Sequence, residues 1–415
     1  MTAAARPVST WARWEIVALL WFAYFLNQAD RQIFGVTLPL IRAEFGLSDQ
    51  QMGLVATTFT IVFGLLVPFA GLAGDRFNRR SIVVLSLLVF SIGTLLTGFA
   101  PGFLFLLLFR GVATGAGEAL YAPAANALIA DNHDETRSRA LSIHQTANYT
   151  GVVLGSLFAG WVADHHGWRA AFAVFGAAGI AWALVILWRA RSAPPPPRSE
   201  IASPARLGES VRYLLSSPSL IGQTLGFSGL VFVLVGYLTW MPTILYERFD
   251  MPLAAAGFYA VVFHHVLGYL GLLAAGFATD RMAVGRPRLR ALSMALALIA
   301  CGPFIWLAAQ GQTPWLVYLA LAGFGLFRGV YDANLYAAIF AEVDNRLRAT
   351  VTGLIVAVAY VVGATAPLLM GILKASLGPQ AGLTLLAAVA AATGVAFFVL
   401  ASAQGARAQL SASKV

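Results

Sequence analysis

Charged residues interrupt three of the apolar stretches in this sequence. They are Asp30 and Arg31 in one stretch, Arg110 and Glu118 in a second, and Arg328 and Asp332 in a third. A charge at the centre of a lipid bilayer costs about 2.5–3.5 kcal/mol even on the most lenient scale, so such residues are functional candidates. Arginine binds carboxylate or phosphate with a rigid fork of donors, and a carboxyl group in a low-dielectric cavity can hold a proton near neutral pH. These residues therefore predict anion binding and proton transfer.

We assign Arg328 and Arg110 to anion binding, with Arg31 as the next candidate. We assign Asp30 and Glu118 to proton coupling. Neighbouring residues diverge by about 100° around a helix, so Asp30 and Arg31 each need a partner on another helix, and we expect Asp30 to pair with Arg110. A structural ion pair between Arg328 and Asp332, four residues apart, explains those two charges about equally well. Further predicted substrate-binding residues are Asp332, Tyr121, Tyr237, Trp240 and Asn334, and lesser proton candidates are His144, His264 and His265.

The composition indicates a membrane protein. Of the 415 residues, 59% are apolar and 11% charged, against about 25% charged in soluble proteins, which excludes a soluble enzyme or a disordered chain. A membrane-spanning helix needs about 20 mainly apolar residues. Twelve such windows occur, near 16–42, 49–74, 81–100, 102–131, 137–163, 168–190, 219–247, 253–279, 288–309, 313–342, 347–373 and 379–403. The predicted fold class is therefore an all-α membrane protein with twelve transmembrane helices in two six-helix bundles.

The chain divides near its middle, at the row of prolines Pro194 to Pro197, which cannot continue a helix. We expect an N-terminal bundle over 1–190, a cytoplasmic linker over 191–217, a C-terminal bundle over 218–403 and a cytoplasmic tail over 404–415. Within the linker, the part near Leu207–Leu215 is compatible with a short amphipathic surface helix. Most of the 27 Lys and Arg residues lie on the side of the predicted helices that holds both ends of the chain. This bias places both termini in the cytoplasm and accounts for the net charge of +9 without nucleic acid.

Three pairs of short motifs repeat between the two halves at similar separations. They are Gly71-x-x-x-Asp75-Arg76 with Gly276-x-x-x-Asp280-Arg281, Arg110-Gly111 with Arg328-Gly329, and Arg137-x-Arg139 with Arg346-x-Arg348. Duplicated six-helix halves are the architecture of transporters that rock around a binding site at the middle of the membrane.

The segment Gly71-Leu-Ala-Gly-Asp75-Arg76-Phe-Asn78-Arg79-Arg80 resembles the signature loop of the major facilitator superfamily, with Asn78 where glycine is usual; asparagine tolerates the same left-handed backbone. Gly167-Trp168-Arg169 is also typical of that family. The first half is most similar to the Spinster-like transporters, through Asn27-Gln-Ala-Asp30-Arg31, Gly115-Ala-Gly117-Glu118-Ala-Leu-Tyr121, Leu128-Ile-Ala-Asp131 and Arg137-Ser-Arg139. Arg110 and Glu118 are eight residues apart, where the family pattern has seven.

The resemblance implies that helices 1, 4, 7 and 10 line the cavity, and that Asp75 latches the transporter by capping the start of helix 11 when it faces outward. A carboxylate near a helix N-terminus is stabilised there. The full set predicted for this conformational latch is Asp75, Arg76, Arg79, Arg80, Asp131, Arg137 and Arg139. The positive-inside bias alone also explains most of these arginines.

Several kinds of chemistry are not expected. The single cysteine, Cys301, excludes a cysteine-based metal site, the adjacent histidine pairs chelate poorly, and no P-loop occurs, so we predict no metal, no cofactor and no ATP-driven pumping. The sequence predicts a monomeric inner-membrane transporter that moves a small organic anion, a carboxylate or sugar acid, by alternating access coupled to protons. Alternatives are a Spinster-like carrier of lysolipid or another amphiphile, a drug exporter, and a signalling receptor on a transporter fold. The drug-exporter alternative is weakened because the fifth predicted helix lacks the glycine-proline pattern of drug–proton antiporters.

Overall fold

The computed structural model describes residues 10–133, 136–189, 204–283, 288–344 and 346–412. Within these ranges the side chains of 10, 12, 71–76, 138, 204–206, 349 and 404–412 lie outside the described residues. Every regular element that the structure describes is a helix, which confirms the predicted fold class. The expected linker segment 191–203 is not among the described residues.

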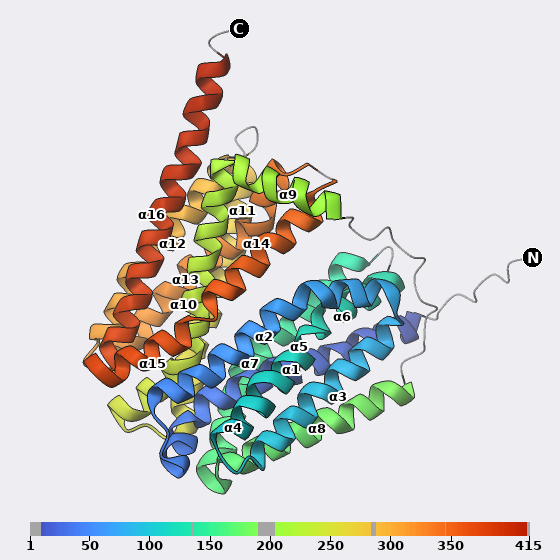
Figure 1. Cartoon of the computed structure of the whole chain (residues 1–415), viewed down its shortest axis with the longest axis vertical. Helices are drawn as coiled ribbons and strands as arrows, with labels where there is room; N and C mark the ends of the chain where they lie inside the picture. Colours follow the sequence, from blue (N-terminus) through green and yellow to red (C-terminus); the bar gives the residue numbers. More distant parts are fainter. Residues whose placement is uncertain (1–9, 134–135, 190–203, 284–287, 345, 413–415) are drawn as a thin grey trace, which may run out of the picture.

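The helices of the first half gather in one bundle (Figure 1). They are α1 (Thr10–Phe45), α2 (Asp49–Arg76), α3 (Arg79–Gly98), α4 (Phe103–Leu106), η1 (Leu107–Thr114), α5 (Gly115–Ala119), α6 (Tyr121–Asn132), α7 (Arg137–His166) and α8 (Trp168–Arg189). The run from α4 to α6 forms one span, of which η1 is a π-helical part.

The second half forms the other bundle. Its helices are α9 (Pro204–Ser216), α10 (Pro218–Phe249), α11 (Leu253–Met282), α12 (Arg288–Gln310), α13 (Pro314–Glu342), α14 (Arg348–Gly363), α15 (Ala366–Leu377) and α16 (Pro379–Ala412). Helix α9 confirms the predicted short helix in the linker, and α14 with α15 forms one broken span. Helix α16 continues to Ala412, past the end expected at 403.

Ten of these spans are long and apolar enough to cross a membrane by length and composition. The other two predicted spans are α1 and α7, whose apolar runs are broken by polar residues. Helix α1 carries Gln28 and Gln32, and α7 carries Gln145 and Asn148, all of which line a cavity inside the protein. The low hydropathy of these two helices therefore reflects polar residues that face inward and not toward lipid.

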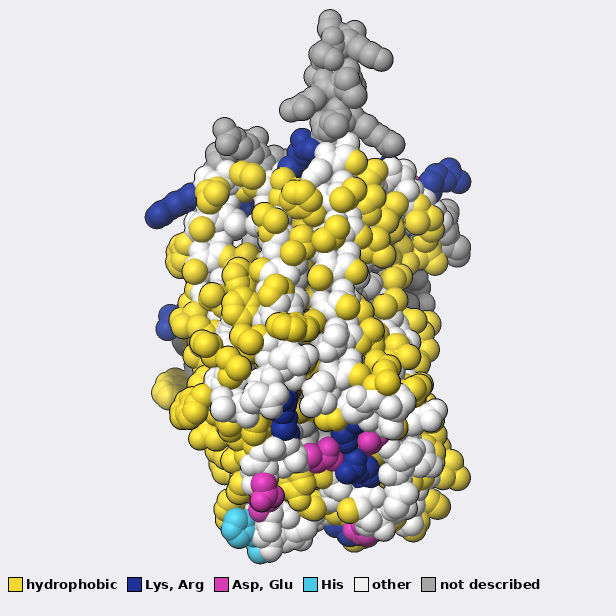
Figure 2. Space-filling model, turned by 90° about the vertical axis from the view of Figure 1, so that its left-hand side faces the viewer, with side chains coloured by type: hydrophobic (Ala, Val, Ile, Leu, Met, Phe, Trp, Pro, Cys, Tyr) yellow, Lys and Arg dark blue, Asp and Glu magenta, His cyan; other side chains and the backbone are white. Residues whose placement is uncertain are grey.

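The outer surface fits a lipid environment. Leu104, Leu184 and Phe277 are more than half exposed, at 60%, 56% and 72%. Figure 2 shows hydrophobic side chains over most of the middle of one face, with charged side chains mainly toward its two ends. Water-soluble monomers rarely expose large apolar patches, so we expect these side chains to contact hydrocarbon.

The two bundles meet at one end and diverge at the other (Figure 1). We call the end where α1 begins and α16 finishes the terminal side, and the opposite end the distal side. Across the interface α2 packs against α14 and α15, α7 against α11, and α1 against α10.

Asn78 corrects one detail of the sequence analysis. Its backbone is extended, with φ of −62° and ψ of 119°, and is not left-handed. Its side-chain oxygen accepts a hydrogen bond from the backbone N–H of Ser81 at 3.3 Å, so it caps the start of α3. Asn78 therefore acts as an N-cap, a position at which asparagine is among the preferred residues.

Candidate functional site: a charged central cavity

A cavity of about 810 Å³ lies between the two bundles, lined by residues of α1, α2, η1, α7, α10, α11, α13 and α14. Its charged lining residues are Arg31, Arg110, Arg328 and Asp332. Along α7 the lining reaches Leu141, near the terminal-side start of that helix. On the distal side the two bundles are in contact, so the cavity is open toward the terminal side.

Asp30 and Arg110 form a buried ion pair between α1 and η1. Arg110 Nη1 donates to Asp30 Oδ2 at 2.8 Å, and Thr94 Oγ1 of α3 donates to Asp30 Oδ1 at 2.6 Å. Asp30 is 2% exposed and Arg110 is 3% exposed. The predicted pairing is thus confirmed, and it explains how a carboxylate without a partner on its own helix is accommodated in the membrane.

Arg31 pairs with Glu118 in the same way. Its Nε donates to Glu118 Oε2, and Glu118 is 1% exposed, while Arg31 reaches the cavity surface. Arg110 Nη2 also donates to the backbone oxygen of Arg31 at 3.3 Å, which joins the two ion pairs into one cluster. We call Asp30, Arg31, Arg110 and Glu118 the four-charge cluster. With both carboxylates ionised, the cluster is electrically neutral.

The π-helix η1 explains the unusual spacing in this cluster. Seven residues make about two α-helical turns, so residues seven apart share one face. A π turn holds one residue more than an α turn. The π-helical segment Leu107–Thr114 therefore keeps Arg110 and Glu118 on one face at a spacing of eight. Thr114 marks the widened turn, because its Oγ1 donates to the carbonyl of Phe109, five residues back, at 2.9 Å.

Two phenylalanines of α2 cover the arginines of the cluster. Arg31 lies over the ring of Phe63, with Cζ 4.3 Å from the ring centroid, and Arg110 lies over Phe59 at 4.7 Å. Contacts of this kind contribute roughly 0.5–2 kcal/mol each. Sequence analysis missed both residues, since a phenylalanine in an apolar helix carries no signal that it faces a charge.

The cavity face of the second bundle carries a less complete pair. Arg328 Nε lies 3.0 Å from Asp332 Oδ2, but the geometry is that of an ion pair without a hydrogen bond, and Nε has no acceptor among the described residues. Both side chains line the cavity and are partly exposed to it, at 16% and 24%. Arg328 is therefore less fully engaged than Arg31 or Arg110.

Four predicted substrate-binding residues are not among the residues that line the cavity in this conformation. Each donates instead to a backbone carbonyl: Tyr121 to Leu20, Tyr237 to Ala260, Trp240 to Pro367 and Asn334 to Val330. All four are buried between helices. Membrane helices need such polar-tipped residues for packing, and the sequence alone does not separate them from cavity residues.

The polar wall that sequence analysis did not single out comes mainly from α1 and α7. It includes Gln28, Gln32, Thr60, Gln145, Asn148 and Tyr149. Of the three histidine candidates, His265 lines the cavity, whereas His144 stacks on Tyr24 with a centroid distance of 4.8 Å. His264 is fully buried against Tyr237 and Phe324.

The predicted latch residues lie on the terminal side. The side chains of Asp75 and Arg76 lie outside the described residues, so the expected cap on the eleventh membrane span, which begins with α14, stays a prediction. The others bind within the first bundle: Arg79 to Asp131, Arg80 to the carbonyl of Leu187, Arg137 to the carbonyl of Ala130, and Arg139 over the ring of Trp14. In the second bundle, Arg290 pairs with Asp280 at 2.6 Å and Arg346 with Glu209 at 2.8 Å.

Comparison with known proteins agrees with this architecture. The Major Facilitator Superfamily model matches residues 20–367. Protein spinster homolog 1 of Xenopus tropicalis is 30% identical over 390 residues, which cover 86% of this chain and 72% of that protein. The hexuronate transporter of Bacillus subtilis is 25% identical over 387 residues, 90% of each chain. A crystal structure of a bacterial homologue of the human lysosomal transporter Spinster, inward-facing and unoccupied, superposes with a TM-score of 0.77 at 23% identity and covers 95% of this chain and 96% of that one.

The fold, the repeat and these matches define a multi-pass membrane transporter and not an enzyme. The chain belongs to the major facilitator superfamily, and within it to the Spinster-like group.

Proposed function

We propose that this protein transports a small organic anion, such as a sugar acid, together with protons, by alternating access. The observation that carries the proposal is Arg328: a guanidinium on the cavity wall whose only ion-pair partner, among the described residues, is not hydrogen-bonded to its Nε. A guanidinium has five donors, so Arg328 keeps donors for the carboxylate of a substrate. The amide-rich wall of α1 and α7 offers donors and acceptors for hydroxyl groups.

The four-charge cluster supplies a route for coupling. Glu118 is buried behind Arg31, and Arg31 faces the cavity. A proton on Glu118 removes the counter-charge of Arg31, so the cavity becomes more positive and attracts an anion. Loss of that proton restores the neutral cluster and favours release. Asp30 holds Arg110 in the same manner and is the second proton site in the proposal.

The orientation in the membrane follows from the basic residues. Arg79, Arg80, Arg137 and Arg346 all lie on the terminal side, and the positive-inside rule places that side in the cytoplasm. In this conformation the central cavity is then open toward the cytoplasm. We propose an inner-membrane location with both termini cytoplasmic, and function as a monomer.

Counterflow in proteoliposomes tests the substrate class. Vesicles loaded with unlabelled D-glucuronate are expected to take up labelled D-glucuronate transiently. Competing D-gluconate should reduce that uptake, whereas neutral glucose should not. No counterflow of any sugar acid in the panel would overturn the anion proposal. The matched control is Arg328→Ala, which should fold and show no counterflow.

A second candidate function is transport of an amphiphile. It is favoured by an aliphatic part of the cavity lining on α10 and α11, formed by Leu230, Leu234, Leu238, Leu272 and Leu273. A hydrocarbon chain would bury against this wall, while Arg328 would bind an anionic head group. Lysophospholipid in the same counterflow panel decides between the two: inhibition by lysophospholipid alone would favour the amphiphile.

A further inference from the structure

Asp164, near the end of α7, bridges the two bundles on the distal side. Its Oδ1 accepts from the backbone N–H of Leu253 and its Oδ2 from that of Ala254, both at 3.0 Å. These are the first two residues of α11, which begins at Leu253. The first N–H groups of a helix have no partner within it, and the helix dipole favours a negative charge there. A carboxylate of the first bundle thus caps a helix of the second.

The helices come close enough for this contact because of Gly160. Added to Gly160, a Cβ atom would lie within 3 Å of the backbone of Leu253 and Ala254. A second contact of the same kind joins α2 to α15: Thr57 Oγ1 accepts from the backbone N–H of Leu368, in the first turn of α15, at 3.2 Å. Both contacts join a side chain of the first bundle to a helix start in the second.

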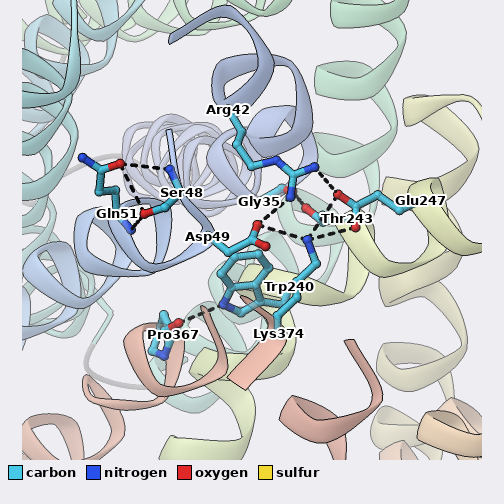
Figure 3. Close-up of polar contacts among 10 residues, drawn as sticks. All are labelled: Gly35, Arg42, Ser48, Asp49, Gln51, Trp240, Thr243, Glu247, Pro367 and Lys374. Carbon is cyan, nitrogen blue, oxygen red and sulfur yellow. Dashed lines mark hydrogen bonds and ion pairs between the residues drawn. The ribbon is translucent and has the colours of Figure 1, made fainter. Parts of the chain in front are cut away.

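Four charged residues form ion pairs with one another on the distal side (Figure 3). Arg42 contacts Asp49 at 2.5 Å and Glu247 at 2.7 Å, and Lys374 contacts Asp49 at 3.0 Å and Glu247 at 2.9 Å. Arg42 and Asp49 belong to the first bundle, Glu247 and Lys374 to the second. Each bundle therefore supplies one cation and one anion, and separating the bundles breaks two ion pairs at once.

We propose that Asp164 is the distal latch of this transporter: by capping α11 it favours the conformation that is closed on the distal side and open on the terminal side. The four charges around Arg42 add to the same closure. Opening the distal side transfers the Asp164 carboxylate and the two N–H groups to water, so the cap acts on the balance between the two conformations. Asp164 would act in this way whenever the two bundles rock against each other, whatever the substrate or the coupled ion.

Double electron–electron resonance spectroscopy measures directly the balance between the conformations that are closed and open on the distal side. Spin labels at Gln50→Cys and Gln312→Cys report the distal separation, because both positions are exposed and lie in different bundles. The native Cys301 is buried and will not take a label. Asp164→Ala should raise the ratio of long to short distances about fivefold, which corresponds to about 1 kcal/mol for a lost N-cap. Asp164→Asn, which keeps one acceptor but no charge, should shift the ratio in the same direction by less.

The matched control is Glu44→Gln. Glu44 is also an exposed carboxylate near the distal side, and the hydrogen bond from Trp168 holds its pKa below the usual range, so it is charged at pH 7. It binds Trp168 and Arg169, within its own bundle, and should leave the distances unchanged. Wild-type distance distributions in both Asp164 variants would overturn the proposal. An equal shift in Glu44→Gln would overturn it too, because it would assign the effect to surface charge in general.

Discussion

Arg328 provides the sharpest test of how this transporter recognises its substrate. We predict that Arg328→Lys weakens binding of D-glucuronate while leaving the fold intact. Lysine keeps the positive charge near Asp332, so the ion pair of the empty site survives. It loses the planar fork that binds a carboxylate through two parallel hydrogen bonds.

The size of the effect follows from the bonds lost. Hydrogen bonds to charged groups contribute about 1.5–3 kcal/mol each, and lysine retains one of the two. Losing one such bond, about 1.5–3 kcal/mol, corresponds to a dissociation constant that is roughly 10- to 150-fold higher. Arg328→Ala should lose more, because it removes the charge as well and leaves Asp332 unpaired. Asp332→Asn should lose less, since it removes only a partner that is not hydrogen-bonded to Arg328 Nε.

Isothermal titration calorimetry on the purified variants measures these constants. Circular dichroism and thermal unfolding establish that each variant is folded before its affinity is compared. Unchanged affinity in both Arg328→Lys and Arg328→Ala would refute the assignment. Arg328 would then be a structural ion-pair residue, and Arg110 would become the candidate for substrate binding.

Three further predictions concern coupling, conformational balance and stability. Asp30→Asn should abolish accumulation against a gradient but permit exchange down a gradient; accumulation with unaltered pH dependence would disprove its role in coupling. Asp75→Ala should slow transport and leave the equilibrium affinity within a few-fold, and a large loss of affinity in folded protein would contradict a latch role. Glu44→Gln should lower the unfolding temperature at pH 7 and change it little in acid. A carboxylate with a depressed pKa stabilises the fold above its unfolded pKa and loses that effect as pH falls through its folded pKa; an equal destabilisation at both pH values would contradict this reasoning.

The arrangement of the helices could be predicted from the sequence because its signals are long and repeated. Apolar windows of span length located the membrane helices, and charges within them located Asp30, Arg110 and Arg328. Even the Asp30–Arg110 pair followed from elementary reasoning, since a buried carboxylate requires a counter-charge on a neighbouring helix.

The details of the site could not be predicted in the same way. Tyr121, Tyr237, Trp240 and Asn334 have the right residue types, but small rotations of a helix decide whether a side chain faces a cavity or another helix. The π-helix at Leu107–Thr114 left only an odd spacing in the sequence. Contacts between the bundles, such as Asp164 with the start of α11, join residues far apart in the chain and depend on the conformation.

The central claim is that protons drive anion accumulation through the four-charge cluster, and one measurement tests it most directly. Proteoliposomes with an interior at pH 8 are diluted into buffer at pH 6 that contains labelled D-glucuronate. The account predicts that wild-type protein concentrates the anion inside, that a protonophore abolishes this accumulation, and that Glu118→Gln only equilibrates it. Accumulation that persists with the protonophore, or that is equal in Glu118→Gln, would contradict the account.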